Sequence, residues 1–263
     1  PHDYVLSPSD ISRLLQADLV VWMGPVIEPY LTSIISRVKQ AKVIDVSQLE
    51  AIEYLAVRDL LAKSAVVGSD SRHLVHAHSS GVHLTKTLSL DHLAYDPHVW
   101  WGLDNVKVII RQLFLKLTDD GESDGGDGKM VFSNDQWIDQ VLAPIQTLRA
   151  IAKIKFSEKP PSFVVFHDGL QYLERDLGVT SSARVSLGDE NRPGIKTLLA
   201  LKQRINQDKV NCVVAEPNTN LSIVKKISGE RTVKVVTIDG LGWDVSSYAE
   251  MLQQAYDGLL GCH

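Results

Sequence analysis

The chain has 263 residues, is 44% hydrophobic, and carries a formal net charge of -5 with an isoelectric point near 6.0. A chain of this length can bury the core of one large domain or of two lobes. Its acidic balance argues against a nucleic-acid-binding protein, which needs a basic surface to neutralise phosphates. No apolar run approaches the ~20 residues that span a bilayer, so we expect no direct membrane insertion.

The first predicted element is a helix with a clear start. Ser7 suits the N-cap, Pro8 the first helical position, and Asp10 the acidic position of a capping box. Two short apolar runs follow, at residues 18–24 and 42–46. Continuous apolar runs of this length are typical of strands buried on both faces of a parallel sheet.

The second half of the chain alternates regularly between strands and helices. We expect strands at residues 162–166, 210–215 and 233–238, and helices at residues 170–177, 194–207, 221–227 and 247–260. Such alternation predicts an α/β fold whose parallel strands are joined by right-handed crossovers.

Polar side chains stand where each of these three strands ends. His167, Glu216 and Asp239 each come directly after a predicted strand. In open α/β sheets, ligands bind outside the carboxyl ends of the strands. These three residues are therefore candidates for a shared site.

Two segments interrupt the alternation, and one long helix separates the halves. Residues 67–92 contain the tract HLVHAHSSGVH (73–83), and the Gly/Asp/Ser run at residues 119–129 predicts a mobile loop. A helical pattern covers residues 134–156 and is the natural joint between two lobes. Pro144 inside it predicts a kink or a break.

The histidines raise the question of a metal site. A His-rich tract is compositionally typical of metal binding, but a flexible loop loses ~1–2 kcal/mol of conformational entropy per residue on ordering. A lone histidine beside tryptophans, such as His98 in DPHVWW, is more often a packed core residue. Taken together, however, His2, His98, His167 and one carboxylate from separate elements suit tetrahedral zinc.

The two cysteines, Cys212 and Cys262, lack the CxxC spacing of a redox or zinc motif. Their spacing alone leaves two buried thiols and a disulfide about equally supported.

Five stretches together resemble a known family. In order they are HDYVLSPSDISRLLQADLVVWMGPVIEPYL, DPHVWW, FHDGLQYLERDLGV, CVVAEPN and TIDGLGWDVSSYAEML. They resemble the zinc-binding solute-binding proteins of bacterial ABC importers, of the ZnuA type, over nearly the whole chain.

The resemblance implies an α/β fold with two Rossmann-like βα lobes, mostly parallel sheets, one long joining helix, and a metal site in the interlobe cleft. It divides the chain into an N-terminal lobe (1–133), a connecting helix (134–156) and a C-terminal lobe (157–263). Members of the family carry a strand, a helix and a strand ahead of the HDY motif. We therefore expect the N-terminal lobe to lack its first elements.

By position, the resemblance implies that His2, His98 and His167 bind the metal, with Asp239 in the fourth place. Glu216 ranks second for that place, and water is a third option. Asp168 is a candidate hydrogen-bond partner of His167, with exposed capping as the alternative. The tract in residues 67–92 matches the family's His-rich loop, which implies an accessory to the site; a disordered loop whose histidines have no role is the alternative.

The resemblance also implies a Cys212–Cys262 disulfide, as in members from Gram-negative bacteria, and therefore a periplasmic protein. The expected function is that of a high-affinity zinc receptor that delivers Zn²⁺ to an inner-membrane ABC permease and catalyses no reaction. We also expect the receptor to be a monomer. A manganese or iron receptor of the same fold is the alternative. A zinc hydrolase using HLVHAH is less favoured, because the tract lacks HExxH.

Overall fold

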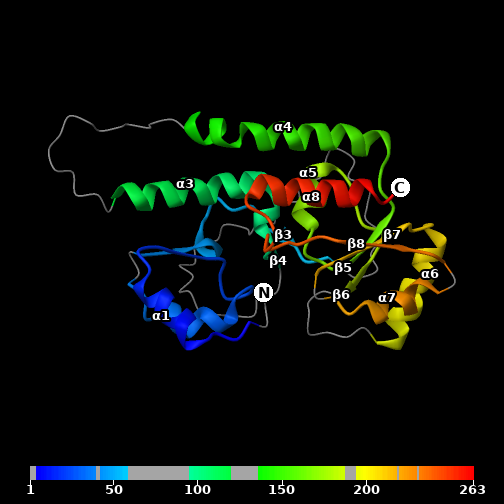
Figure 1. The fold of residues 1–263 in the computed structure, drawn as a ribbon, viewed down its shortest axis with the longest axis horizontal. Coiled ribbons are helices and arrows are strands. Elements are labelled where there is room, and N and C mark those ends of the chain that lie inside the picture. Colours follow the sequence, from blue (N-terminus) through cyan, green and yellow to red (C-terminus); the bar gives the residue numbers. More distant parts are fainter. Residues whose placement is uncertain are drawn as a thin grey trace, which may run out of the picture.

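The computed structural model describes residues 4–39, 42–58, 95–119, 136–186, 194–217, 219–229 and 231–263. Helix α4 (Gln136–Glu158) runs along the top of the molecule (Figure 1). Below it lie helix α3 (Leu103–Asp119) on the N-terminal side and helix α8 (Tyr248–Leu260) on the C-terminal side. Because α4 contacts both α3 and α8, it connects the two halves along their shared edge.

The N-terminal half begins as predicted. Helix α1 (Pro8–Gln16) has Ser7 as its N-cap, and the reciprocal hydrogen bonds between Ser7 and Asp10 form a capping box. Strand β1 (Val20–Trp22) pairs in parallel with β2 (Val43–Asp45). A 3-10 turn, η1 (Pro29–Leu31), and the short helix α2 (Thr32–Ile35) lie between these strands.

The expectation that these strands are buried on both faces is wrong for β1. Val20 and Trp22 are buried in a small cluster with α2, whereas Val21 between them is 42% exposed. Side chains alternate across a strand, so only one face of β1 is covered.

A short pair of antiparallel strands follows the parallel pair in the N-terminal half. After the turn η3 (Val46–Gln48), strand β3 (Leu55–Ala56) pairs with β4 (Tyr95–Asp96). The turn η5 (Val99–Trp101) then leads into α3. No strong periodicity announces these two-residue strands in the sequence.

Helix α4 continues through Pro144, so a break is wrong, and a kink stays a prediction. Its buried face is formed by Ile138, Leu142, Ile145, Ala152 and Phe156, at helical spacing. Pro144 lies on the exposed face, where its ring meets solvent. Packing of the opposite face on α3, α5 and α8 holds the helix together despite the missing N–H.

The C-terminal half contains a four-stranded, wholly parallel sheet. Its strands are β5 (Phe163–His167), β6 (Arg184–Ser186), β7 (Cys212–Ala215) and β8 (Lys234–Thr237), in the order β6-β5-β7-β8. Three of these strands match the sequence prediction, and β6 was not predicted. The helices between and after the strands are α5 (Gln171–Leu177), α6 (Ile195–Gln207), α7 (Leu221–Ser228) and α8.

Both faces of the central strands β5 and β7 are covered. Phe163 and Val165 of β5 face the large core shared with α4, α5 and α8, while Val164 faces a second core with α6 and α7. The large core also takes in side chains of the N-terminal half, including Ile44 and Trp101. Hydrophobic packing is therefore continuous between the halves.

The order of the strands creates a crevice between β5 and β7. From β5 the chain turns to β6 on one side, and from β7 it turns to β8 on the other. Neighbouring loops therefore diverge at the carboxyl ends of β5 and β7, which is the usual ligand position in a doubly wound sheet.

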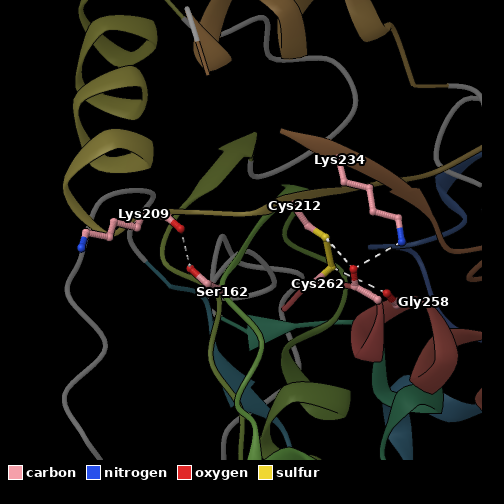
Figure 2. Close-up of a disulfide and its surroundings, with 7 residues drawn as sticks. Ser162, Lys209, Cys212, Lys234, Gly258 and Cys262 are labelled. Carbon is pink, nitrogen blue, oxygen red and sulfur yellow. Dashed lines mark hydrogen bonds between the residues drawn. A yellow bond between two sulfur atoms is a disulfide. The ribbon is translucent and has the colours of Figure 1, made fainter. Parts of the chain in front are cut away.

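The disulfide between Cys212 and Cys262 is present, with a Cα–Cα distance of 5.3 Å (Figure 2). It links the first residue of β7 to the segment after α8. The backbone N–H of Ser162 also donates to the carbonyl of Cys262, 3.1 Å away. The implied pairing is confirmed, and it lies at the end of β7 opposite the crevice.

Within the part of the chain that the structure describes, no helix has the length and apolar character needed to cross a membrane.

Candidate metal centre

A cavity of about 570 Å³ opens at the carboxyl ends of the C-terminal strands. Its walls come from both halves of the molecule. His98 and Trp100 approach from the turn before α3, and His167, Glu216 and Asp239 approach from the ends of β5, β7 and β8. The cavity therefore occupies the crevice that the strand order creates.

His98 is held by a carboxylate two residues earlier in the chain. Oδ1 of Asp96 accepts hydrogen bonds from the backbone N–H of His98 at 3.0 Å and from its Nδ1 at 2.7 Å. Both residues are buried. Because a carboxylate only accepts, Nδ1 carries the proton, and Nε2 is the nitrogen with a lone pair for a metal.

His167, the last residue of β5, has a similar arrangement. Its Nδ1 lies 3.2 Å from Oε1 of Glu216, which follows the neighbouring strand β7. Burial would raise the pKa of Glu216, but the hydrogen bond from His167 and the nearby imidazole of His98 outweigh it, and the pKa is lowered. Glu216 is therefore an anionic partner that orients His167.

The two imidazoles are close neighbours. Their ring centroids are 4.9 Å apart, and the rings stand nearly perpendicular, at 77°. Gly169 packs against His98 so tightly that an added Cβ would lie 3.3 Å from its Nε2 and Cδ2. Two histidines predicted from separate elements are thus brought together at one wall of the cavity.

Asp239 lines the same cavity, but its carboxylate accepts hydrogen bonds from the backbone of the loop that follows it. Its Oδ1 accepts the backbone N–H groups of Leu241 at 3.0 Å and Gly242 at 3.1 Å, and its Oδ2 accepts that of Trp243 at 2.6 Å. Oδ2, with one donor, keeps a lone pair. Glu216 is the carboxylate beside His167 because β7 adjoins β5, whereas β8 is one strand further away.

The remaining predicted residues are placed as follows. His2, the histidine tract and residues 120–129 lie outside the described residues. Asp168 is buried, and it bonds to Arg58 and Arg184. The alternative of exposed capping is therefore wrong, and a hydrogen bond from His167 to Asp168 stays a prediction. Within the described ranges, no three His, Cys, Asp or Glu side chains form a group that could hold a metal.

Sequence reasoning missed Asp96. Its signal is the spacing in DPH, because an Asp side chain readily accepts the backbone N–H two residues later. The same side chain then reaches the Nδ1 of the histidine it caps.

Comparison with known proteins agrees with this architecture. The family model described as "ZnuA: Zinc-uptake complex component A periplasmic" matches residues 1–262. A curated relative from Yersinia pestis, named high-affinity zinc uptake system protein ZnuA, is 27% identical over 275 residues, covering 100% of this chain and 80% of the relative. The protein of the same name from Haemophilus influenzae is 28% identical over 290 residues, covering 100% and 83%.

Among solved structures, the periplasmic zinc-binding protein TroA from Treponema pallidum has the same fold. The TM-score is 0.67 at 17% identity, and the match covers 100% of this chain and 86% of TroA. The two-lobed α/β architecture expected from the sequence is thus confirmed. The family match extends from the first residue to the penultimate one, and the chain belongs to the ZnuA family of periplasmic zinc-uptake components.

Proposed function

We propose that the chain is a periplasmic, high-affinity zinc receptor that delivers Zn²⁺ to the permease of an inner-membrane ABC importer. Its family membership supports this proposal, as do the curated relatives that carry the name high-affinity zinc uptake system protein. The Cys212–Cys262 disulfide supports it as well, because disulfides persist in oxidising compartments such as the periplasm. We further propose that the receptor acts as a monomer and binds the metal without catalysing a reaction.

The observation that carries the proposal is the buried pair of imidazoles. His98 and His167 lie side by side at the cavity wall, and Nδ1 of each is paired with a carboxylate. Histidines that bind zinc commonly donate their other ring N–H to a carboxylate, which fixes the tautomer and raises the basicity of the binding nitrogen. The pair therefore has the arrangement expected of two zinc ligands.

We propose that His2 and Asp239 complete the ligand set. This set would combine three imidazoles with one carboxylate, a composition that suits tetrahedral zinc. Asp239 would contribute through Oδ2, which has one N–H donor. We also propose lobes at residues 1–133 and 157–263 on either side of a connecting segment at 134–156.

Ligand chemistry favours zinc over the alternative cargo. Manganese and iron(II) bind more weakly than zinc to the same nitrogen-rich site, and manganese prefers oxygen ligands. We expect a strong preference for Zn²⁺ over Mn²⁺ in direct competition.

The first test is a competitive zinc titration of the metal-stripped protein against a chromophoric chelator. We expect one tight site that is lost in His98→Ala and in His167→Ala. We expect it to be kept in His263→Ala, a matched histidine beside Lys159 at the C-terminus, and in a deletion of residues 72–83. Tight binding that vanishes only with the deletion would reject the cavity as the principal site.

Acidification gives a second test. Imidazole binds a metal only when neutral, so zinc binding should release protons and weaken as the pH falls. We expect the apparent affinity to decrease steadily from pH 7.5 to pH 5.5 in the same titration. An affinity independent of pH over this range would argue against histidine ligands.

A further inference from the structure

Arg58 connects the two halves of the molecule beside the histidine pair. It stands two residues after β3 in the N-terminal half, and its guanidinium bonds two carboxylates of the C-terminal half. Its Nε donates to Oδ2 of Asp168 at 3.2 Å, and its Nη2 donates to Oδ1 of Asp168. Its Nη1 and Nη2 donate to the two oxygens of Glu174, at 2.7 and 3.2 Å.

These contacts are largely shielded from water. The side chain of Arg58 is 17% exposed, and both carboxylates are buried more deeply. A second cation, the buried Arg184 of β6, has its Nε 3.4 Å from Oδ1 of Asp168. Two cations thus face two anions, which avoids an uncompensated buried charge.

The geometry of the guanidinium matters here as well as its charge. Its planar fork matches two carboxylates in fixed orientations, and a lysine ammonium at the same position would be a single point charge. Glu174 is itself anchored, because its Oε2 accepts the backbone N–H of Ser181 at 3.1 Å. Arg58 therefore ties Asp168 to a fixed point on α5.

Asp168 is the central residue of the segment that contacts both imidazoles. His167 precedes it, and Gly169, which follows it, packs against the ring of His98. A shift of Asp168 would move His167 through the chain and would change the packing surface of His98. The backbone N–H of Asp168 also donates to the carbonyl of Ser186 at 3.2 Å, so β6 and Arg58 hold this segment from two sides.

We propose that Arg58 is a positioning residue for zinc binding: through Asp168 it holds the 167–169 segment and so fixes the spacing of the His98 and His167 imidazoles. This inference rests on the proposed function. Arg58 itself does not bind the metal. Its role is to preset the distance between two ligands before zinc arrives.

The test compares variants of two arginines that cross the same interface. Arg58→Met removes the fork and the charge, and Arg58→Lys keeps only the charge. Arg175→Met is the matched control, because Arg175 also links the halves, through Glu53 at 2.9 Å, and its ion pairs are with Glu53 and Asp176 instead of Asp168. Each variant is titrated with zinc, loaded with Co²⁺ for visible absorption spectroscopy, and melted thermally.

We expect both Arg58 variants to weaken zinc binding by about tenfold, the lower end of the cost of losing a group that orients ligands, because Arg58 acts on both rings through Asp168. Their Co²⁺ absorption bands should also shift, because the coordination geometry changes. Arg175→Met should lower the melting temperature without changing either the zinc affinity or the Co²⁺ spectrum. A purely structural role for Arg58 would likewise lower the melting temperature and leave the spectrum unchanged.

A charge-balanced variant keeps the test decisive if Arg58→Met does not fold. Arg58→Met/Glu174→Gln removes one cation and one anion, and the amide oxygen of Gln can still accept the Ser181 N–H. This double variant should fold and should still bind zinc more weakly than the wild type. Zinc affinity within about twofold of wild type would overturn the role of Arg58 while leaving the proposed function intact. Absent zinc binding in the wild type, or tight binding in His98→Ala, would instead reject the proposed function.

Discussion

The two parallel sheets of this molecule differ in how completely they are covered. The C-terminal sheet has four strands, its central strands β5 and β7 are covered on both faces, and Val164 of β5 is fully buried. The described N-terminal parallel sheet has two strands, and Val21 at the centre of β1 is exposed. Yet the cavity needs both halves, because His167 ends a strand of the large sheet and His98 lies on the turn after a two-residue strand.

This difference implies two ways of fixing a ligand. His167 inherits its position from a buried strand, because the backbone of β5 is bonded on both sides. His98 has no such strand and depends on side-chain contacts. Two of these contacts are the double hydrogen bond to Asp96 and the close approach of Gly169. The third is indirect: the hydroxyl of Tyr172 in α5 donates to the Asp96 carbonyl at 2.7 Å and so ties the segment before His98 to α5.

The largest expected effect concerns the disulfide of the C-terminal half. Replacing both Cys212 and Cys262 by Ser should lower the free energy of unfolding by about 2–4 kcal/mol, because the unfolded chain regains the freedom of a long loop. Zinc affinity should change little, since the bond lies at the opposite end of β7 from Glu216. Chemical denaturation and zinc titration of the double variant check the two parts separately.

Adding a reductant to the wild-type protein is the control, and it should reproduce the loss of stability. A large fall in zinc affinity without a change in stability would mean that the disulfide acts on the cavity itself.

The second prediction compares the carboxylates that orient the two histidines. Asp96→Asn should weaken zinc binding by about 10–100-fold, because His98 loses its anionic partner. Glu216→Gln should cost less than about tenfold, because β5 already holds His167 and the Glu216 side chain is 39% exposed. Titration of both variants under identical conditions measures the difference.

The reverse order would change the interpretation of the site. If Glu216→Gln weakened zinc binding more than Asp96→Asn did, Glu216 would be acting as a metal ligand, and the place proposed for Asp239 would be in question.

The third prediction compares the loss of stability when the same substitution, Val to Ala, is made in each of the two sheets. Val164→Ala removes two buried methyl groups and should cost about 2 kcal/mol of unfolding free energy. Val21→Ala makes the same change at an exposed position and should stay within about 0.5 kcal/mol. Denaturant midpoints followed by circular dichroism provide the comparison. Equal costs would show that Val21 is covered in solution.

Local signals explain which parts of the fold the sequence predicted. The start of α1 was predicted to the residue because Ser7, Pro8 and Asp10 act within one turn. Strands β5 and β7 were found because they contain short apolar runs, and β8 because β-branched residues dominate residues 233–238. Strand β6 was missed because Arg184–Ser186 has a charged and a hydroxyl residue in a run of three, and its burial comes only from the tertiary fold.

The site could be predicted only where a residue's role follows from its own strand end or from the family resemblance. His98 and His167 are brought together as expected, and the full ligand set stays a prediction. The partners that hold them were not foreseen. Arg58 reaches Asp168 and Glu174 across 110 and 116 residues, and no pattern along the chain links positions so far apart. The three hydrogen bonds that engage Asp239 likewise depend on the backbone path of its loop.

The smallest predicted effect concerns the N-cap of helix α1 in the N-terminal half. The hydroxyl of Ser7 accepts the backbone N–H of Asp10 at 3.3 Å, and Ser7→Ala removes this cap at a typical cost of about 1 kcal/mol. Because α1 has no fully buried residue, this cost should appear as local opening and leave the C-terminal sheet unaffected. Hydrogen exchange of the α1 amides should accelerate about fivefold, while amides of β5 and β7 keep their rates. Ser7→Thr retains the cap and should stay close to wild type. Faster exchange throughout the C-terminal sheet in Ser7→Ala would instead mean that the two halves unfold as one unit, and that the difference in coverage does not translate into a difference in local stability.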